Sequence, residues 1–160
     1  MTRYRGILFD FDYTLADSSA GVHVCINHAL SALSLDPVQK EYSDRTIGLS
    51  LGDTFEALTG ITDEVQTGCF AKHFIEKADA VMADMTAMLP GAAKIIPVLA
   101  ERGYKLGIVS TKYGYRIESI LVKSNMRPYF SVIVGGENVK RHKPDPERVY
   151  MALGAMDLPP

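Results

Sequence analysis

Asp10 and Asp12 are two carboxylates, one residue apart, that follow a short apolar run at the start of the chain. Carboxylates this close repel one another unless a cation or a shared proton relieves them. Mg²⁺ prefers oxygen ligands, usually takes few protein carboxylates, and completes its shell with water and substrate phosphate oxygens. The pair therefore suggests a magnesium-assisted site. A solvent-exposed acidic turn would show the same sequence pattern and is the alternative.

Hydroxyl and ammonium groups follow two later apolar runs. Ser110 and Thr111 come directly after the run YKLGIV, where a hydroxyl can donate to a phosphate oxygen. Lys143 lies in the segment KRHKPDP, and its compact positive charge suits a phosphate or a neighbouring carboxylate. Each of these residues alone is more typical of a turn or a solvated loop. Their combined meaning depends on the elements that position them.

The apolar segments predict a parallel sheet. Continuous apolar runs, typical of strands buried on both faces, occur at 6–9, 104–109 and 131–134. Segments with helical spacing alternate with them at 92–102, 115–124 and 147–153. This alternation indicates βαβ units, and ligands bind beyond the carboxyl ends of the strands in such sheets. Asp10, Ser110 and Lys143 are therefore expected to meet at one edge of one sheet.

A block with helical spacing and no convincing strand separates the first strand from the others. Helices are predicted from a cap at Ser18 or Ser19 to about residue 33, at 52–58 and at 63–85. The fold class is therefore α/β, a Rossmann-like parallel sheet with an inserted all-helical cap. Residues 1–16 and 88–160 are predicted to form the core and 17–87 the cap, which would act as a lid.

Composition narrows the classes of partner. The chain has 160 residues, 47% of them hydrophobic, and a formal net charge of −2. A chain of this size can bury a core, and it carries no global positive field that would attract nucleic acid or an anionic membrane. No stretch approaches the roughly 18 apolar residues of a membrane span, and no signal segment precedes the first strand. A cytoplasmic location is expected.

Taken together, the segments DFDYTLADS, LGIVSTK and KRHKPDP resemble the first three motifs of the haloacid dehalogenase superfamily, in order and in strand context. The resemblance runs over essentially the whole chain and is strongest to phosphoglycolate-phosphatase-like members with a helical cap. It implies a Mg²⁺-dependent phosphatase that hydrolyses a small phosphorylated metabolite through an aspartyl phosphate. A sugar-phosphate mutase or a pyrophosphatase of the same superfamily is the alternative.

The resemblance also implies roles for the four motif side chains. Asp10 would attack phosphorus, and Asp12 would protonate the leaving oxygen and then activate water. The Asp10 carboxylate and the Asp12 backbone carbonyl would hold Mg²⁺. Ser110 would bind a phosphoryl oxygen, and Lys143 would offset negative charge. This division suits phosphoryl transfer, which depends mostly on positioning and charge stabilisation.

Four further positions are candidate substrate contacts. The backbone amides of Phe11 and Thr111 would add donors for the phosphate, as in anion-binding nests. Because the core would handle only the phosphoryl group, specificity would come from the cap. Its segment RTIGLSLG contributes the candidates Arg45 and Gly48.

Two features depart from the family pattern. Tyr13 stands where glycine is frequent, and a bulky residue does not easily take a positive φ, so either the turn does not need one or Tyr13 is strained. No Gly–Asp pair, the family's fourth motif, follows Lys143. We therefore expect a core that is incomplete at its C-terminal end, with an open edge on its first strand that would favour self-association. The chain would then be a truncated phosphatase, or a weakly active or non-catalytic form.

Overall fold

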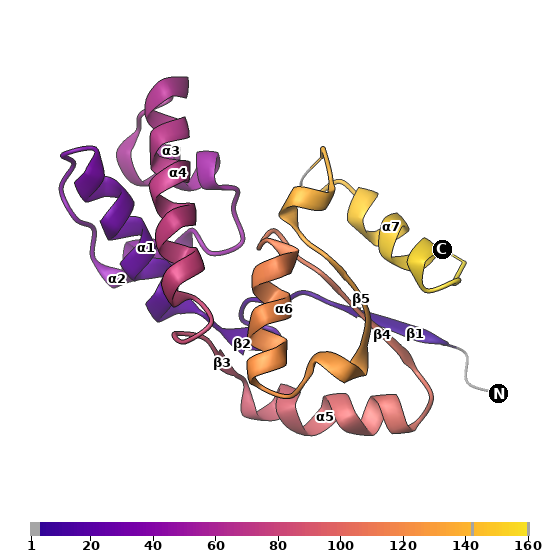
Figure 1. Ribbon diagram of the computed structural model, residues 1–160. Coiled ribbons are helices and arrows are strands. Elements are labelled where there is room, and N and C mark those ends of the chain that lie inside the picture. Colours follow the sequence, from indigo (N-terminus) through magenta and orange to yellow (C-terminus); the bar gives the residue numbers. More distant parts are fainter. Residues whose placement is uncertain (1–3, 142, 160) are drawn as a thin grey trace. The chain divides into compact units, whose positions relative to one another are not determined.

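A computed structural model describes residues 4–141 and 143–159 (Figure 1). The chain divides into two compact units, Met1–Asp17 with Ala87–Pro160 and Ser18–Thr86. The strands are β1 Gly6–Phe9, β2 Ala16–Asp17, β3 Ala87–Met88, β4 Lys105–Val109 and β5 Phe130–Val134. The helices are α1 Ser19–Ala32, α2 Lys40–Arg45, α3 Leu51–Thr59, α4 Glu64–Val81, α5 Pro90–Glu101, α6 Gly114–Lys123 and α7 Glu147–Ala155. Two 3₁₀ turns, Arg127–Tyr129 and Gly136–Asn138, flank β5.

The first unit contains the predicted parallel sheet, with strand order β1-β4-β5. Both pairs are parallel: Gly6 lies opposite Lys105 at the start of β1, and Val109 lies opposite Val134 at the end of β4. Because all three strands run the same way, the residues that follow them emerge at the same edge. The predicted α/β class is thus confirmed, and the elements at this edge carry three of the candidate side chains.

Helices cover the sheet on both sides. α5 packs against β4, α6 against β5, and α7 against β4 and β5. Figure 1 shows α6 and α7 on opposite sides of β5. One buried cluster joins the strand ends to α7 through Val109, Val134 and Ala152, with Leu8 packed against it. This apolar contact fixes α7, and hence the loop that precedes it, relative to the sheet edge.

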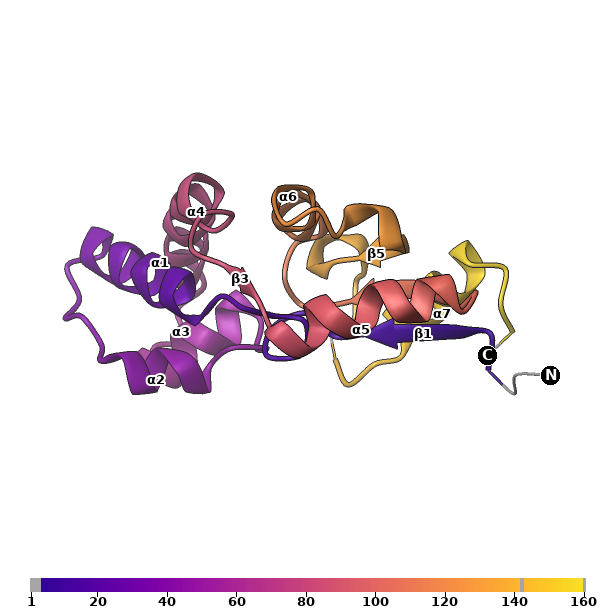
Figure 2. The same ribbon diagram turned by 90° about the horizontal axis from the view of Figure 1, so that it is seen from below.

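β1 is an edge strand among the described residues. It pairs only with β4, and in Figure 2 it lies on the side of the sheet away from β5. All four of its residues are partly exposed, whereas β4 is buried from Leu106 to Val109. The self-association expected through this edge stays a prediction, and sedimentation over a range of concentrations would test it.

The sheet unit also contains a short antiparallel pair that the sequence did not predict. Ala16 pairs with Met88 and Asp17 with Ala87, which joins β2 to β3. The predicted cap of the first helix of the block is confirmed, because Ser18 is the N-cap residue of α1, which begins at Ser19. A strand of two residues is too short to show any periodicity in the sequence.

The helical unit, Ser18–Thr86, is built around the packing of α1 on α4. Phe70 lies at its centre, with its ring centroid 4.9 Å from that of Phe55 and 6.3 Å from that of Phe74. Side chains also define where two helices begin. Ser50 Oγ accepts the amide of Asp53 at the start of α3, and Asp63 Oδ1 accepts the amide of Gln66 at the start of α4. Such caps explain why these helices begin where they do.

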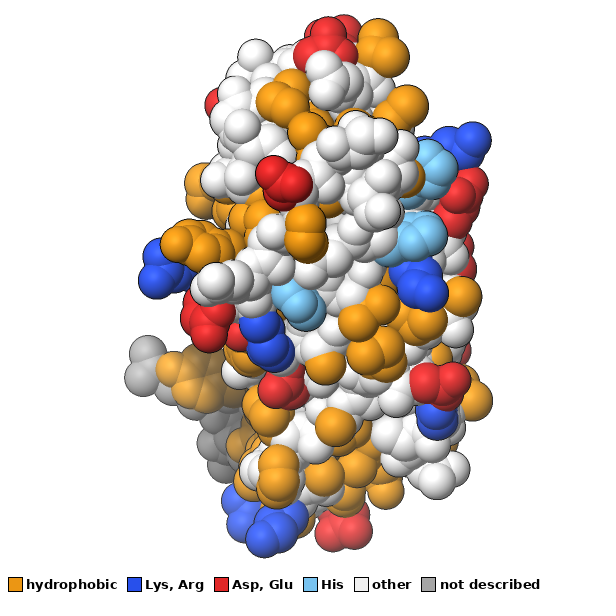
Figure 3. All heavy atoms as spheres, turned by 90° about the vertical axis from the view of Figure 1, so that its left-hand side faces the viewer, with side chains coloured by type: hydrophobic (Ala, Val, Ile, Leu, Met, Phe, Trp, Pro, Cys, Tyr) orange, Lys and Arg blue, Asp and Glu red, His pale blue; other side chains and the backbone are white. Residues whose placement is uncertain are grey.

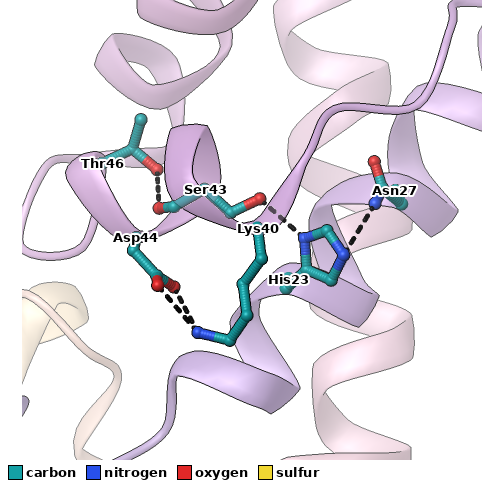
Figure 4. A network of polar contacts seen from close by, with 6 residues as sticks. All are labelled: His23, Asn27, Lys40, Ser43, Asp44 and Thr46. Carbon is teal, nitrogen blue, oxygen red and sulfur yellow. Dashed lines mark hydrogen bonds and ion pairs between the residues drawn. The ribbon is translucent and has the colours of Figure 1, made fainter.

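A polar network ties α1 to α2 (Figure 4). Asn27 binds both backbone groups of Val38 with its amide, and its Nδ2 also lies 3.3 Å from Nε2 of His23. Nε2 must then accept, so Nδ1 of His23 donates to Ser43 Oγ at 2.9 Å. α2 itself was not predicted, because KEYSDR carries no apolar period.

The surface drawn in Figure 3 mixes charged and apolar side chains. Basic and acidic groups are interspersed over this face rather than gathered into one field, in keeping with the small net charge of the chain. None of the helices among the described residues combines the length and the apolar character needed to cross a bilayer.

Candidate active site

The loop that carries both aspartates is wound around one buried residue. Phe11 is fully buried, and its carbonyl accepts the amides of Thr14, Leu15 and Ala16 at 3.3, 2.9 and 3.2 Å. Tyr13 within this loop has φ +58°, the left-handed conformation. The second of the two alternatives for Tyr13 is therefore correct, since the turn does require a positive φ.

Asp10 begins this loop directly after β1. Its Oδ1 accepts the amide of Phe11 at 2.8 Å, and its Oδ2 lies 2.8 Å from Nζ of Lys143. The Asp10 and Lys143 side chains are 44% and 39% exposed, so the pair is open to a ligand. The structure thus brings together two residues that are 133 positions apart, as predicted from the parallel strands (143 minus 10).

Asp12 has a different cation. Its Oδ2 lies 3.3 Å from Nζ of Lys112, and these two side chains are only 12% and 7% exposed. Lys112 is the last residue of the segment LGIVSTK, and no role was predicted for it from the sequence. Each of the two neighbouring carboxylates therefore has its own lysine, which relieves their mutual repulsion.

Ser110 lies at the end of β4 and is buried. Its amide donates to the Val134 carbonyl at 3.0 Å, and its Oγ accepts the amide of Lys112 at 3.2 Å. Thr111, the next residue, is partly buried. A β-carbon on Gly136 would overlap the Thr111 carbonyl oxygen, so a glycine is required for this close approach. Both predicted positions are thus held rigidly at the carboxyl edge of the sheet.

Arg148 is a second basic residue that the sequence analysis missed. It lies on α7 and is 1% exposed, the largest fully buried side chain among the described residues. Burial lowers the pKa of its guanidinium, and the negative charges of Asp10, Glu147 and Glu137 oppose that shift. Arginine stays protonated in proteins, so Arg148 adds positive potential that acts on Asp10.

Arg45 and Gly48 belong to the helical unit. Arg45 is the last residue of α2 rather than part of a loop, and its guanidinium carbon lies 5.7 Å from the ring centroid of Tyr42. Gly48 has φ +100° and open space where a β-carbon would stand. Their contact with a substrate stays a prediction.

The donor set at the sheet edge fits a hard cation. Among residues 4–141 and 143–159, no group of three or more His, Cys, Asp or Glu side chains gathers into a metal site. The residues available near Asp10 offer carboxylate and backbone oxygens rather than thiolate or imidazole. An oxygen site with few protein ligands suits Mg²⁺, which keeps several waters and takes phosphate oxygens.

Comparison with known proteins agrees with this geometry. The family model described as haloacid dehalogenase-like hydrolase matches residues 7–160. Pyrophosphatase PpaX of Bacillus pumilus is 32% identical over 156 residues, which cover 96% of this chain and 69% of that protein. Phosphoglycolate phosphatase of Escherichia coli is 28% identical and aligns with 98% of this chain and 70% of its own length.

Solved structures give the same result. A haloacid dehalogenase-like hydrolase from Bacteroides fragilis superposes with a TM-score of 0.93 and 38% identity, covering 98% of this chain and 75% of that one. A phosphatase from Clostridium acetobutylicum has a TM-score of 0.87 at 20% identity, over 98% of this chain and 72% of that one. The latter likeness bears on the fold alone.

Proposed function

Because the chain belongs to the haloacid dehalogenase-like hydrolase family, we propose that it is a Mg²⁺-dependent phosphatase that hydrolyses a small phosphomonoester through a phosphorylated Asp10. The observation that carries this proposal is the pairing of two adjacent aspartates with two different lysines at one sheet edge. An exposed acidic turn would not need two separate cations. Asp10 is the more exposed of the two carboxylates, which suits the group that attacks the substrate.

The first half of the reaction transfers the phosphoryl group to Asp10. A carboxylate oxygen of Asp10 attacks phosphorus, and the bond from phosphorus to the ester oxygen breaks. Asp12 donates a proton to that departing oxygen, which leaves as an alcohol. Lys143 and the buried Arg148 offset the negative charge that gathers around Asp10 during the transfer.

The second half returns Asp10 to its starting state. Asp12, now deprotonated, takes a proton from a water molecule, and the resulting hydroxide attacks the phosphorus of the aspartyl phosphate. The acyl phosphate bond breaks and inorganic phosphate leaves. Ser110 and the amide of Thr111 are the proposed donors to the phosphoryl oxygens. The Asp10 carboxylate and the Asp12 carbonyl would hold Mg²⁺, which when bound neutralises phosphoryl charge.

Two relatives suggest which substrates to try first. The similarity to a phosphoglycolate phosphatase supports a small phosphorylated acid, and the similarity to a pyrophosphatase supports inorganic pyrophosphate as a second candidate. The proposed attack of the Asp10 carboxylate on phosphorus would serve either substrate. We expect Arg45, as a cation of the helical unit, to bind the remainder of the substrate, so that Arg45→Met raises KM and leaves kcat unchanged.

The deciding experiment is hydrolysis of p-nitrophenyl phosphate, 2-phosphoglycolate and pyrophosphate, each with Mg²⁺ and with EDTA. We expect turnover only with Mg²⁺, and loss of turnover in Asp10→Asn, which keeps the shape of the side chain but removes the nucleophile. Activity that survives in Asp10→Asn would rule out the assigned nucleophile. Absence of turnover on all three substrates would favour a non-catalytic form.

A further inference from the structure

The pair of Lys112 and Asp12 is more deeply buried than the pair of Lys143 and Asp10. Lys112 is 7% exposed and Asp12 12%, against 39% and 44% for the other pair. Lysine is almost never buried in proteins unless its charge is paired. An ion pair removed from water is strong only when its geometry is well defined, because desolvation opposes it. Lys112 is therefore not an ordinary solvated surface lysine, and its burial needs a separate explanation.

The backbone of Lys112 is fixed on both sides. Its amide donates to Ser110 Oγ at 3.2 Å, and its carbonyl accepts the amide of Gly136 at 3.0 Å. These two bonds hold the residue between the end of β4 and the turn after β5. The direction of the side chain toward Asp12 thus follows from the sheet itself, and not from a mobile loop.

We propose that Lys112 is a positioning residue for Asp12 and controls proton transfer at this site. This inference rests on the proposed function, in which Asp12 gives its proton to the departing oxygen. Lys112 lies 3.3 Å from Oδ2 of Asp12 and so restricts the orientation of the carboxyl group. Proton transfer depends steeply on such alignment. The two lysines then have different tasks, since Lys143 acts on the nucleophile and Lys112 acts on the proton donor.

Two esters with different leaving groups distinguish a residue that acts on the nucleophile from one that acts on the proton donor. An alkyl phosphate releases an alkoxide, which needs the proton of Asp12 as the ester bond breaks. p-Nitrophenyl phosphate releases a stable phenolate, which departs without that proton. The constant kcat/KM reports the steps up to formation of the aspartyl phosphate. A defect in proton donation therefore lowers kcat/KM for the alkyl ester selectively, whereas a general loss of structure lowers it for both.

The test compares wild type with Lys112→Met on glycerol phosphate and p-nitrophenyl phosphate. We expect kcat/KM to fall roughly 10²-fold for glycerol phosphate, within the range of general acid catalysis. For p-nitrophenyl phosphate we expect a fall of less than about 3-fold, because no proton is required. An equal fall for the two esters, or no fall, would overturn the proposal. The matched control is Lys94→Met, which removes an exposed lysine from α5 and should change neither value.

A cycle with Asp12→Asn tests whether Lys112 acts through Asp12. In the Asp12→Asn background, Lys112→Met should cause no further loss on glycerol phosphate. A full additional loss would show that Lys112 acts independently. Urea unfolding of wild type, the two single variants and the double variant, without Mg²⁺, gives a second measurement. The loss of unfolding free energy in the double variant should be smaller than the sum of the losses in the two single variants.

The outcomes separate this inference from the proposed function. If wild type is active, Asp10→Asn is inactive and Lys112→Met lacks the leaving-group effect, the positioning role is wrong and the phosphatase proposal stands. If wild type hydrolyses neither ester, the proposed function is wrong and the catalytic role of Lys112 is wrong with it. The urea measurements then decide whether Lys112 and Asp12 interact in the folded protein. If the losses of stability in the two single variants simply add in the double variant, Lys112 does not hold Asp12.

Discussion

Nζ of Lys143 lies 2.8 Å from Oδ2 of Asp10, while Nζ of Lys112 lies 3.3 Å from Oδ2 of Asp12. Two carboxylates one residue apart are thereby separated electrostatically, each facing a cation that comes from a different part of the sheet edge. The Asp10–Lys143 pair is open to solvent, whereas the Asp12–Lys112 pair leaves only a small part of the Asp12 carboxyl group exposed. This asymmetry is the structural basis for assigning different chemistry to the two aspartates.

Lys143→Met should lower activity strongly and stability weakly. In the proposed mechanism Lys143 offsets charge at the reacting group, and removing one such contact from an active site typically costs about 10²–10³ in rate. Its exposed ion pair contributes less than about 1 kcal/mol to folding. Steady-state kinetics and urea unfolding measure the two effects. Lys140→Met on the same segment is the control, since it removes an exposed lysine whose amide alone contacts Glu147. Equal losses in both variants would contradict the assignment.

Tyr13 in the left-handed conformation predicts an unusual response to substitution. Tyr13→Ala and Tyr13→Gly both remove the ring, but only glycine removes the β-carbon that disfavours a φ of +58°. Tyr13→Gly should therefore be more stable than Tyr13→Ala by about 1 kcal/mol, even though glycine has more freedom in the unfolded chain. Urea unfolding of the two variants measures the difference. If alanine were the more stable, the turn would not be left-handed in solution.

Ionisation of Glu147 should make the stability of the fold depend on pH. Desolvation tends to raise the pKa of its carboxyl group, but hydrogen bonds from the Arg141 and Lys140 amides and the charge of Arg141 hold that pKa below its ordinary value of 4.5. A lowered folded-state pKa stabilises the fold above the unfolded value, and this stability is lost as the pH falls through the folded value.

Glu147→Gln should therefore be less stable than wild type at pH 7 and should approach wild type as the pH falls from about 5 toward 3. Thermal unfolding at four or five pH values measures the gap. A gap that stays constant over this range would show that the charge of Glu147 is not the cause. Because Glu147 binds the segment just before Lys143, the variant should also lose activity at neutral pH.

Gly135 should be the least replaceable glycine of the sheet unit. A β-carbon there would overlap the backbone nitrogen of Gly114 and the carboxylate of Glu137, which accepts that amide at the start of α6. Backbone atoms cannot move aside, so we expect Gly135→Ala to cost about 3 kcal/mol or more. Gly91→Ala on α5 is the control, because nothing lies within 4 Å of its added carbon. Urea midpoints would show a large loss in the first variant and little change in the second.

The strands of the sheet could be predicted from the sequence, but only part of the candidate site could. Strand runs such as Gly6–Phe9 were found correctly, because continuous apolar residues are a strong signal. The meeting of Asp10 with Lys143 followed from parallel strands. Lys112 was missed because a lysine after a strand is usually solvated, and only the fold shows that its stem turns toward Asp12. Arg148 was missed for the same reason, since its burial depends on how α7 packs.

Local features without a sequence period were also beyond prediction. α2, Lys40–Arg45, is six residues long and carries no apolar stripe, and a hydrogen bond between Ser43 and His23 joins it to α1. For Tyr13 the sequence posed the question of a positive φ but could not answer it, since the conformation follows from three amides that share the Phe11 carbonyl. Short elements of this kind depend on tertiary contacts rather than on local propensity.

The two-stranded ladder of β2 and β3 has a consequence for protein engineering. Asp17 lies directly opposite Ala87, so the Cα atoms of the two residues that flank the segment 18–86 are about 5 Å apart. A two-residue turn such as Asn–Gly spans that gap in natural hairpins. The helical segment 18–86 can therefore be removed or exchanged at the junction of β2 and β3. A minimal catalytic sheet, or a chimera carrying the helices of another relative, could be made at this junction without redesigning a single strand.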